Sequence, residues 1–242
     1  MLRLSPPNSK TNFLLDHIEK KFKVRLKNSE FLSLSLPAGI SCPGASACKS
    51  YVQVKNNERK IIDTPTCKFR CFSASTEVQY LEVYKQRIHN LRQLQRTKNI
   101  NKLLLDGITE SVRLIRLHVS GDFFDYKYLL AWINFAKQRP KTYIYAYTKS
   151  LHFLKKLNKN ANELTNNIKL VMSHGGKHDD LIPELKKKGF ISSRVVYGKQ
   201  EAKKLGLQID HDDSLCAFGN KDFALLIHGI QPHWNRCKRG YG

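Results

Sequence analysis

The sequence lacks the features that would place it in or across a membrane. No apolar run is long enough to cross a bilayer, and residues 1–24 contain two prolines and four lysines where a secretory signal would have an apolar centre. P-loop, GxGxxG, GxSxG and HExxH motifs are also absent, so none of these common nucleotide, hydrolase or zinc-protease sites is indicated. Without a secretory signal, the six cysteines are expected to be reduced thiols in a cytoplasmic protein.

Acidic residues are scarce. The chain has 20 Asp and Glu residues against 42 Lys and Arg residues, which gives a formal net charge of +22. A field of that size attracts polyanions, so nucleic acid is the expected partner. The alternative is a general drift toward basic composition, because the lysines are spread along the chain instead of forming one tail. Charge concerns association and not chemistry, so the substrate and the oligomeric state stay open.

The length and composition suit one globular domain. The chain has 242 residues, of which 41% are hydrophobic, and these values are typical of a single α/β domain with its own core. We expect a polar lead-in over residues 1–28, a domain over residues 29–230 and a basic tail over residues 231–242. In the lead-in, apolar side chains recur at helical spacing over residues 12–23, which predicts a packed amphipathic helix.

Strand and helix patterns alternate along the domain. The predicted strands cover residues 31–37, 112–119, 142–147, 168–172, 193–197 and 223–228, and the predicted helices cover residues 75–98, 126–138, 151–157, 180–188 and 199–205. This order favours parallel pairing through right-handed crossovers, hence either a partial (β/α) barrel or an open, mostly parallel sheet with flanking helices. Both architectures place functional residues at the carboxyl ends of the strands.

Four cysteines lie in the segment after the first strand. Residues 38–75 hold Cys42, Cys48, Cys67 and Cys71 among glycines and prolines, which predicts a long functional loop that ends where Ser75 caps the next helix. Such thiols suit a soft metal, and their spacings, x5 and x3, fit neither a zinc finger nor a zinc ribbon. The alternative is that these cysteines are small buried hydrophobic residues.

Three later features are weaker candidates. Cys216, just before the last strand, is a candidate fourth metal ligand, whereas Cys237 in the tail is interpreted as a bystander. The acidic segment DHDD, residues 210–213, either binds a cation or forms a solvated loop.

Polar residues also follow the later strands. Ser120, Gly121 and Asp122 are candidates for cofactor binding, because a glycine lets the backbone approach a ligand closely. Asp122 could equally cap the following helix. Lys149 and His174 stand after the next two strands, and with Asp122 they are the candidate catalytic residues. His174 could instead be a structural hydrogen-bonding residue.

Four segments carry a family resemblance: residues 34–45 (LSLPAGISCPGA), 69–75 (FRCFSAS), 118–124 (HVSGDFF) and 145–150 (YAYTKS). They resemble the phage gene product 88 family over roughly residues 30–230. In that pattern Cys42, Cys48 and Cys71 match best, Cys216 resembles a late cysteine, and Cys67 is less typical. The activity of the family is not assigned, so the resemblance implies kinship more than function.

The position of the cysteine segment is also similar to that in radical SAM enzymes. The likeness implies a partial (β/α) barrel with a [4Fe–4S] cluster held by the loop, and S-adenosylmethionine bound near residues 120–122. The CxxxCxxC signature is incomplete, because Ala74 stands where the third cysteine belongs. We therefore predict a metalloprotein, of iron–sulfur type, that binds or modifies nucleic acid by divergent radical SAM-like chemistry. The alternative is a non-catalytic nucleic-acid-binding protein with a structural zinc site.

Overall fold

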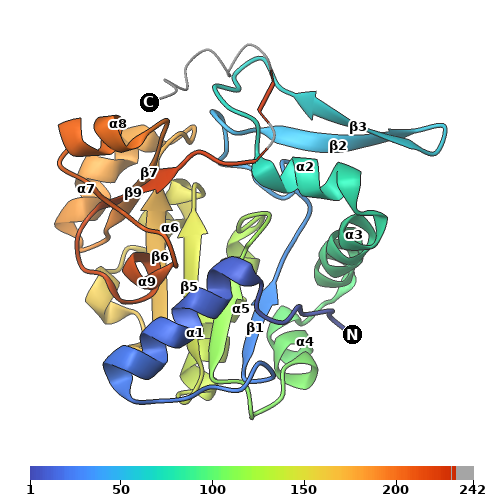
Figure 1. Cartoon of the computed structure of the whole chain (residues 1–242). Coiled ribbons are helices and arrows are strands. Elements are labelled where there is room, and N and C mark those ends of the chain that lie inside the picture. The colour runs from blue at the N-terminus through green and yellow to red at the C-terminus, as the bar shows by residue number, and fades with distance from the viewer. Residues whose placement is uncertain (230, 233–242) are drawn as a thin grey trace.

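A computed structural model describes residues 1–229 and 231–232 of the chain, without the side chains of residues 9–11 (Figure 1). The predicted basic tail lies almost wholly outside the described residues, and Cys237 lies outside them too.

A seven-stranded parallel sheet forms the centre of the molecule. Its strand order is β1-β4-β5-β6-β7-β9-β8, so neighbours follow chain order until the last two strands exchange places. The strands are β1 (Phe31–Leu34), β4 (Leu114–Leu117), β5 (Tyr143–Thr148), β6 (Ile168–Ser173), β7 (Ser192–Val196), β8 (Gln208–Ile209) and β9 (Phe223–Leu226). The predicted open parallel sheet is confirmed, and the sheet does not close into a barrel.

Helices cover both faces of this sheet. They are α1 (Ser9–Phe22), α2 (Phe72–Gln79), α3 (Leu81–Arg96), α4 (Ile100–Gly107), α5 (Tyr126–Gln138), α6 (Leu151–Leu157), α7 (Ile182–Lys187), α8 (Lys199–Lys204) and α9 (Ser214–Phe218).

The two faces have separate cores because side chains alternate along each strand. In β5, Ile144 and Ala146 join the large apolar core beneath α3 to α7, whereas Tyr145 joins a smaller core on the other face. Leu14 and Ile18 of α1 belong to that smaller core together with residues of α9. Figure 1 shows α1 and α9 in front of the sheet. The amphipathic lead-in helix therefore packs on the domain.

A hairpin interrupts the segment that the sequence predicts to be a loop. Strands β2 (Ser50–Lys55) and β3 (Glu58–Asp63) pair in antiparallel fashion, and Figure 1 shows them projecting beside α2. Asn56 and Asn57 make the turn with φ of 49° and 62°, a conformation that asparagine tolerates and that two-residue hairpin turns require. The predicted long cysteine-bearing segment follows the first strand, but the prediction missed this hairpin because it overlooked the alternating pattern before the Asn-Asn pair.

The helix predicted over residues 75–98 is two helices. α2 begins after Cys71, and the chain is extended at Tyr80, with φ −115° and ψ 105°, before α3 begins. Ser75 lies inside α2 and does not cap it. The prediction is wrong here because the apolar spacing continues across the break and hides it.

Candidate functional site

The cysteine loop is hydrogen-bonded to the carboxyl edge of the sheet. The backbone N–H groups of Ser46 and Ala47 donate to the carbonyl of Gly175 at 3.2 and 2.9 Å, and Lys177 N donates to the carbonyl of Gly44 at 2.8 Å. Gly175 is the second residue after β6, so these bonds join the loop to the end of a central strand. The loop is thus placed at the edge where the sequence predicted the site.

Two glycines allow the loop to approach the strand ends closely. A Cβ on Gly44 would lie 2.1 Å from the carbonyl oxygen of Lys149, and a Cβ on Gly121 would lie 2.6 Å from both Leu36 Cβ and Ser41 Oγ. Gly121 also has a φ of 88°. The sequence predicted that Gly121 leaves room for a ligand, but the chain's own Leu36 and Ser41 approach it.

Three thiols of the loop lie within electrostatic range of one another. Burial raises the pKa of Cys42, Cys48 and Cys71, that of Cys71 to about 11, and the neighbouring thiols raise these pKa values further. Asp122 adds to the rise at Cys42 and Cys48, whereas the ammonium group of Lys149 opposes it at Cys48. The structure therefore brings these three cysteines together with Asp122 and Lys149.

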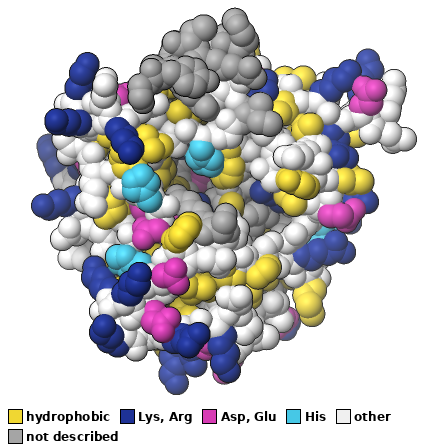
Figure 2. All heavy atoms as spheres, in the orientation of Figure 1, with side chains coloured by type: hydrophobic (Ala, Val, Ile, Leu, Met, Phe, Trp, Pro, Cys, Tyr) yellow, Lys and Arg dark blue, Asp and Glu magenta, His cyan; other side chains and the backbone are white. Residues whose placement is uncertain are grey.

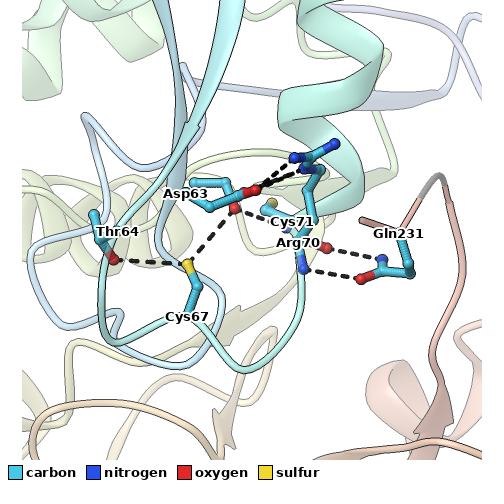
Figure 3. Close-up of polar contacts among 7 residues, drawn as sticks. Asp63, Thr64, Cys67, Arg70, Cys71 and Gln231 are labelled. Carbon is cyan, nitrogen blue, oxygen red and sulfur yellow. Dashed lines mark hydrogen bonds and ion pairs between the residues drawn. The ribbon is translucent and has the colours of Figure 1, made fainter. Parts of the chain in front are cut away.

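Cys67 lies beside this group and bonds to hydroxyl groups. Its Sγ is 3.6 Å from Thr64 Oγ1 and 3.8 Å from Ser50 Oγ (Figure 3). The same Ser50 oxygen accepts a hydrogen bond from Cys71 N at 3.1 Å, so one side chain links both cysteines. Cys67 is also an electrostatic neighbour of Cys48.

Arg70 holds the segment between Cys67 and Cys71. Its guanidinium group pairs with Asp63 at 2.5 Å, which ties the segment to β3. Its backbone N–H donates to Gln231 Oε1 at 2.9 Å, and its carbonyl accepts from Gln231 Nε2 at 3.0 Å (Figure 3). Gln231 was not predicted as a site residue, since a single glutamine in a basic tail carries no recognisable signal.

Asp122 is a buried hydrogen-bond acceptor. Its carboxylate accepts from Thr148 Oγ1 at 2.7 Å, from Lys149 N at 2.8 Å and from Phe123 N at 2.7 Å. Burial raises its pKa, and these hydrogen bonds oppose the rise. The residue that caps α5 is Asp125, whose side chain accepts from Lys127 N, so the alternative that Asp122 is the cap is wrong. A ligand contact at Asp122 stays a prediction.

Glu77 of α2 joins the loop to the segment after β4 and to α3. Its Oε1 accepts from Ala38 N at 2.9 Å, from Ser120 Oγ at 3.3 Å and from the guanidinium group of Arg87 at 2.9 Å. The predicted cofactor residue Ser120 is thus bonded within the protein. Glu77 was not predicted, because in a helical sequence a buried glutamate looks the same as an exposed one.

The two candidate catalytic residues after β5 and β6 have different surroundings. Lys149 Nζ donates to Ser173 Oγ at 2.5 Å and lies within electrostatic range of Cys48. His174 Nε2 is 3.3 Å from Ser192 Oγ, and its Nδ1 is 3.2 Å from the guanidinium group of Arg194. Burial and Arg194 lower the pKa of His174. These contacts match the structural alternative for His174, and no loop cysteine is among them.

Cys216 lies in a different place from the loop cysteines. It is buried in α9, a helix that the sequence reading missed, and packs in the smaller core with Tyr145. Its backbone N–H donates to Asp210 at 3.1 Å, and its electrostatic neighbours are Asp213, Tyr147, Asp210 and Arg116. No loop cysteine is among the neighbours that shift its pKa.

The acidic segment of residues 210–213 is not a solvated loop. Asp213 is fully buried, with φ 66°, and pairs with the guanidinium group of Arg116 at 2.7 Å. The positive charge that this segment contacts is therefore the Arg116 side chain.

Two absences concern the described residues as a whole. No three His, Cys, Asp or Glu side chains in the described part of the chain are positioned to hold a metal ion. Across the same residues, no helix is both long and apolar enough to span a membrane.

Comparison with known proteins identifies the family. The model of the family described as Gene product 88 matches residues 8–240, which is nearly the whole chain and includes all the loop cysteines. No curated protein and no solved structure matches the chain. The chain belongs to the Gene product 88 family.

Proposed function

We propose that the cysteine loop binds a soft metal at the carboxyl edge of the sheet, in a protein that binds or modifies nucleic acid. The supporting observation is that Cys42, Cys48 and Cys71 lie within electrostatic range of one another, with Cys67 next to Cys48. Their side chains do not form a finished metal site, so binding requires the thiols to rotate toward a common point. Cys67 is the nearer candidate for the fourth ligand, because Cys216 has other neighbours.

The electrostatics around the loop thiols favour a cation. The three thiols lie within electrostatic range of one another, Asp122 lies within range of Cys42 and Cys48, and burial raises the pKa of each of these four groups. Without a cation, repulsion and desolvation keep such thiols protonated. A metal ion reverses this balance, because a coordinated thiol loses its proton. Lys149 supplies a positive charge that acts on Cys48 and on Asp122.

An iron–sulfur cluster is the preferred occupant, and zinc is the alternative. An all-sulfur ligand set suits either metal. The x5 spacing between Cys42 and Cys48 departs from those of zinc fingers, which favours the cluster. When bound, a cluster supplies one-electron chemistry, while the bonds from Asp122 to Thr148 and Lys149 hold the strand ends beside it. S-adenosylmethionine near residues 120–122 is supported by the radical SAM resemblance alone.

Metal analysis of anaerobically purified protein tests the metal proposal. A brown protein with iron and sulfide would support the cluster, a colourless protein with zinc would support the alternative, and a protein without metal would reject both. Cys42→Ala and Cys48→Ala should lose the metal, whereas Cys237→Ala should keep it. Full metal content in the Cys42→Ala/Cys48→Ala double variant would show that the ligands are wrongly assigned.

Two matched variants decide the fourth ligand. Cys67→Ala should lower metal content, and Cys216→Ala should not, if the ligand comes from the loop. The opposite pattern would assign Cys216. Calorimetric titration of the metal-loaded protein with S-adenosylmethionine tests the cofactor, and absence of binding heat would remove it from the proposal.

A further inference from the structure

Helix α3 carries a row of basic side chains along one side. Lys85, His89, Arg92 and Arg96 recur at spacings of four, three and four residues, which places them on one face of a helix. The buried residues of α3 include Arg87, Asn90, Leu91 and Leu94, which belong to the opposite side of the helix. His89 Nε2 lies 2.9 Å from the carbonyl oxygen of Met1, whereas Lys85, Arg92 and Arg96 are exposed, so these three cations are available to a partner.

This face borders a groove of about 370 Å³ without an acidic lining residue. The groove is lined by Tyr84, Lys85, Ile88, His89, Arg92, Gln93 and Arg96. Arg92 and Arg96 are exposed, and neither has an ion-pair partner among residues 1–229 and 231–232. Lys85 pairs with Glu82 at 2.9 Å, but both side chains are exposed, so the pair is weak and easily exchanged.

The larger groove beside α1 provides a contrast. It has a volume of about 530 Å³ and is lined by Asp16 and Glu19 as well as Lys20, Lys23 and Arg25. Its acidic residues partly neutralise its basic ones, so a polyanion would gain less there. In Figure 2 the Lys and Arg side chains lie around the margin of the visible face and do not form one central patch. The net charge alone therefore does not locate a binding surface, whereas the row on α3, in which Arg92 and Arg96 have no acidic partner among the described residues, does.

We propose that the α3 groove binds the sugar–phosphate backbone of a nucleic acid. This inference rests on the nucleic-acid part of the proposed function and locates its contact surface. From Lys85 to Arg96 the helix rises about 16 Å, which equals the rise of about five nucleotides in one strand. Three permanent cations along that length suit about three phosphates. Phosphate contacts carry no sequence information, so this surface sets affinity and position and does not select a sequence.

The surface is connected to the cysteine loop through the chain. α2 begins directly after Cys71 and α3 follows it, while the buried side of α3 is tied back by the Arg87–Glu77 ion pair at 2.9 Å. A backbone bound along α3 would therefore lie against the element that continues from the proposed metal site. Tyr84 offers a ring to a sugar or an unpaired base in the same groove.

The test compares two double variants that each remove two positive charges. Arg92→Gln/Arg96→Gln alters the groove, and Lys203→Gln/Lys204→Gln alters exposed residues of α8, which Figure 1 shows on the opposite side of the molecule. Glutamine has a helix propensity close to those of arginine and lysine, so both variants should fold. Fluorescence anisotropy with a labelled 20-base-pair duplex and a labelled 20-nucleotide single strand, at several salt concentrations, gives affinity and salt slope.

We expect the groove variant to bind about tenfold more weakly than the α8 control. Its slope of log K against log salt should be shallower by about 1.8 on the duplex and about 1.4 on the single strand, because two phosphate contacts are lost. The α8 control should keep the wild-type slope. Arg92→Lys/Arg96→Lys, which keeps both charges, should bind within a few-fold of wild type and so exclude a general folding defect.

The outcomes separate this inference from the proposed function. If wild type binds and the groove variant matches the α8 control in affinity and slope, the α3 groove is not the binding surface, although the nucleic-acid proposal survives. If wild type does not bind either probe at low salt, the nucleic-acid proposal fails and this inference fails with it. The metal proposal is judged separately by the metal content of the cysteine variants.

Discussion

The loop cysteines and Cys216 differ in whether the charged groups around the thiol are paired with other groups of the protein. Burial raises the pKa of the thiol in both regions. Around Cys216, Asp213 pairs with Arg116, and Tyr147 donates hydrogen bonds to Asp210 and Asp213. Around the loop thiols, Cys67 and Asp122 raise the pKa of Cys48, and Lys149 opposes the rise. The acidic groups near Cys216 are thus bonded within the protein, whereas the loop thiols lie near one another and near Asp122.

The largest expected effect would come from breaking the ion pair in the Cys216 region. Asp213→Asn leaves the buried Arg116 guanidinium group without its counter-charge, and loss of one partner of a buried pair costs about 3–5 kcal/mol. Asparagine tolerates the left-handed backbone at this position, so the substitution tests the charge and not the turn. Urea unfolding measures the free energy.

The matched control for that change is a surface pair. Glu82→Gln removes the exposed partner of Lys85 and should alter the free energy of unfolding by less than about 0.5 kcal/mol. A loss below about 1 kcal/mol in Asp213→Asn would mean that the Cys216 region does not depend on its ion pair. The contrast between paired charges near Cys216 and the surroundings of the loop thiols would then be contradicted.

The next effect concerns the packing of the loop on the strand ends. Gly44→Ala places a Cβ where the carbonyl oxygen of Lys149 lies at 2.1 Å, so we expect a loss of about 3 kcal/mol, at the upper end of overpacking costs, and a lower metal content. Gly198→Ala is the control, because nothing lies within 4 Å of its added Cβ. Equal melting temperatures for the two variants would contradict the close approach at Gly44.

A smaller effect concerns pH and the strand end beneath the loop. Burial lowers the pKa of His118 from 6.5 to about 3, so between these values the unfolded chain binds a proton that the folded protein does not. The free energy of unfolding should therefore fall with falling pH in this window, by about 2 kcal/mol between pH 6.5 and pH 5 from this residue.

His118→Asn isolates that contribution. The substitution removes the titration and suits the φ of 62° at this position. The difference between wild type and variant, measured by urea unfolding from pH 7 to pH 4, should show the slope. Parallel pH profiles would mean that His118 titrates normally in the folded protein.

The smallest expected effect concerns Asp125, which caps α5 and is not part of the proposed metal site. Asp125→Ala should cost about 1 kcal/mol of stability, and Asp125→Asn should restore most of it, because asparagine also accepts from the Lys127 N–H. Neither change should alter metal content. A loss of metal in Asp125→Ala would show that the cap of α5 is part of the loop site.

Local patterns in the sequence determined most of the secondary structure. The helices at Tyr126–Gln138 and Leu151–Leu157 have the predicted bounds, since apolar periodicity acts within a few turns of the chain. The parallel order of the strands also followed from the alternation of strands and helices. Local reading failed at Tyr80 and at the hairpin after Ser50, where a short break and a short turn lie inside continuous patterns.

Only the tertiary structure decided which polar residues meet. Gln231 and Arg70 are separated by 161 positions in the sequence, and Ala38 and Glu77 by 39 positions. No local pattern in these segments indicates that the residues are in contact. The carboxyl edge of a parallel sheet could be predicted to gather the loop, Asp122 and Lys149, because each follows a strand. The separation of Cys216 from the loop cysteines could not be predicted, because its position depends on α9 folding onto the other face of the sheet. Arg116 and Tyr147 are its neighbours there.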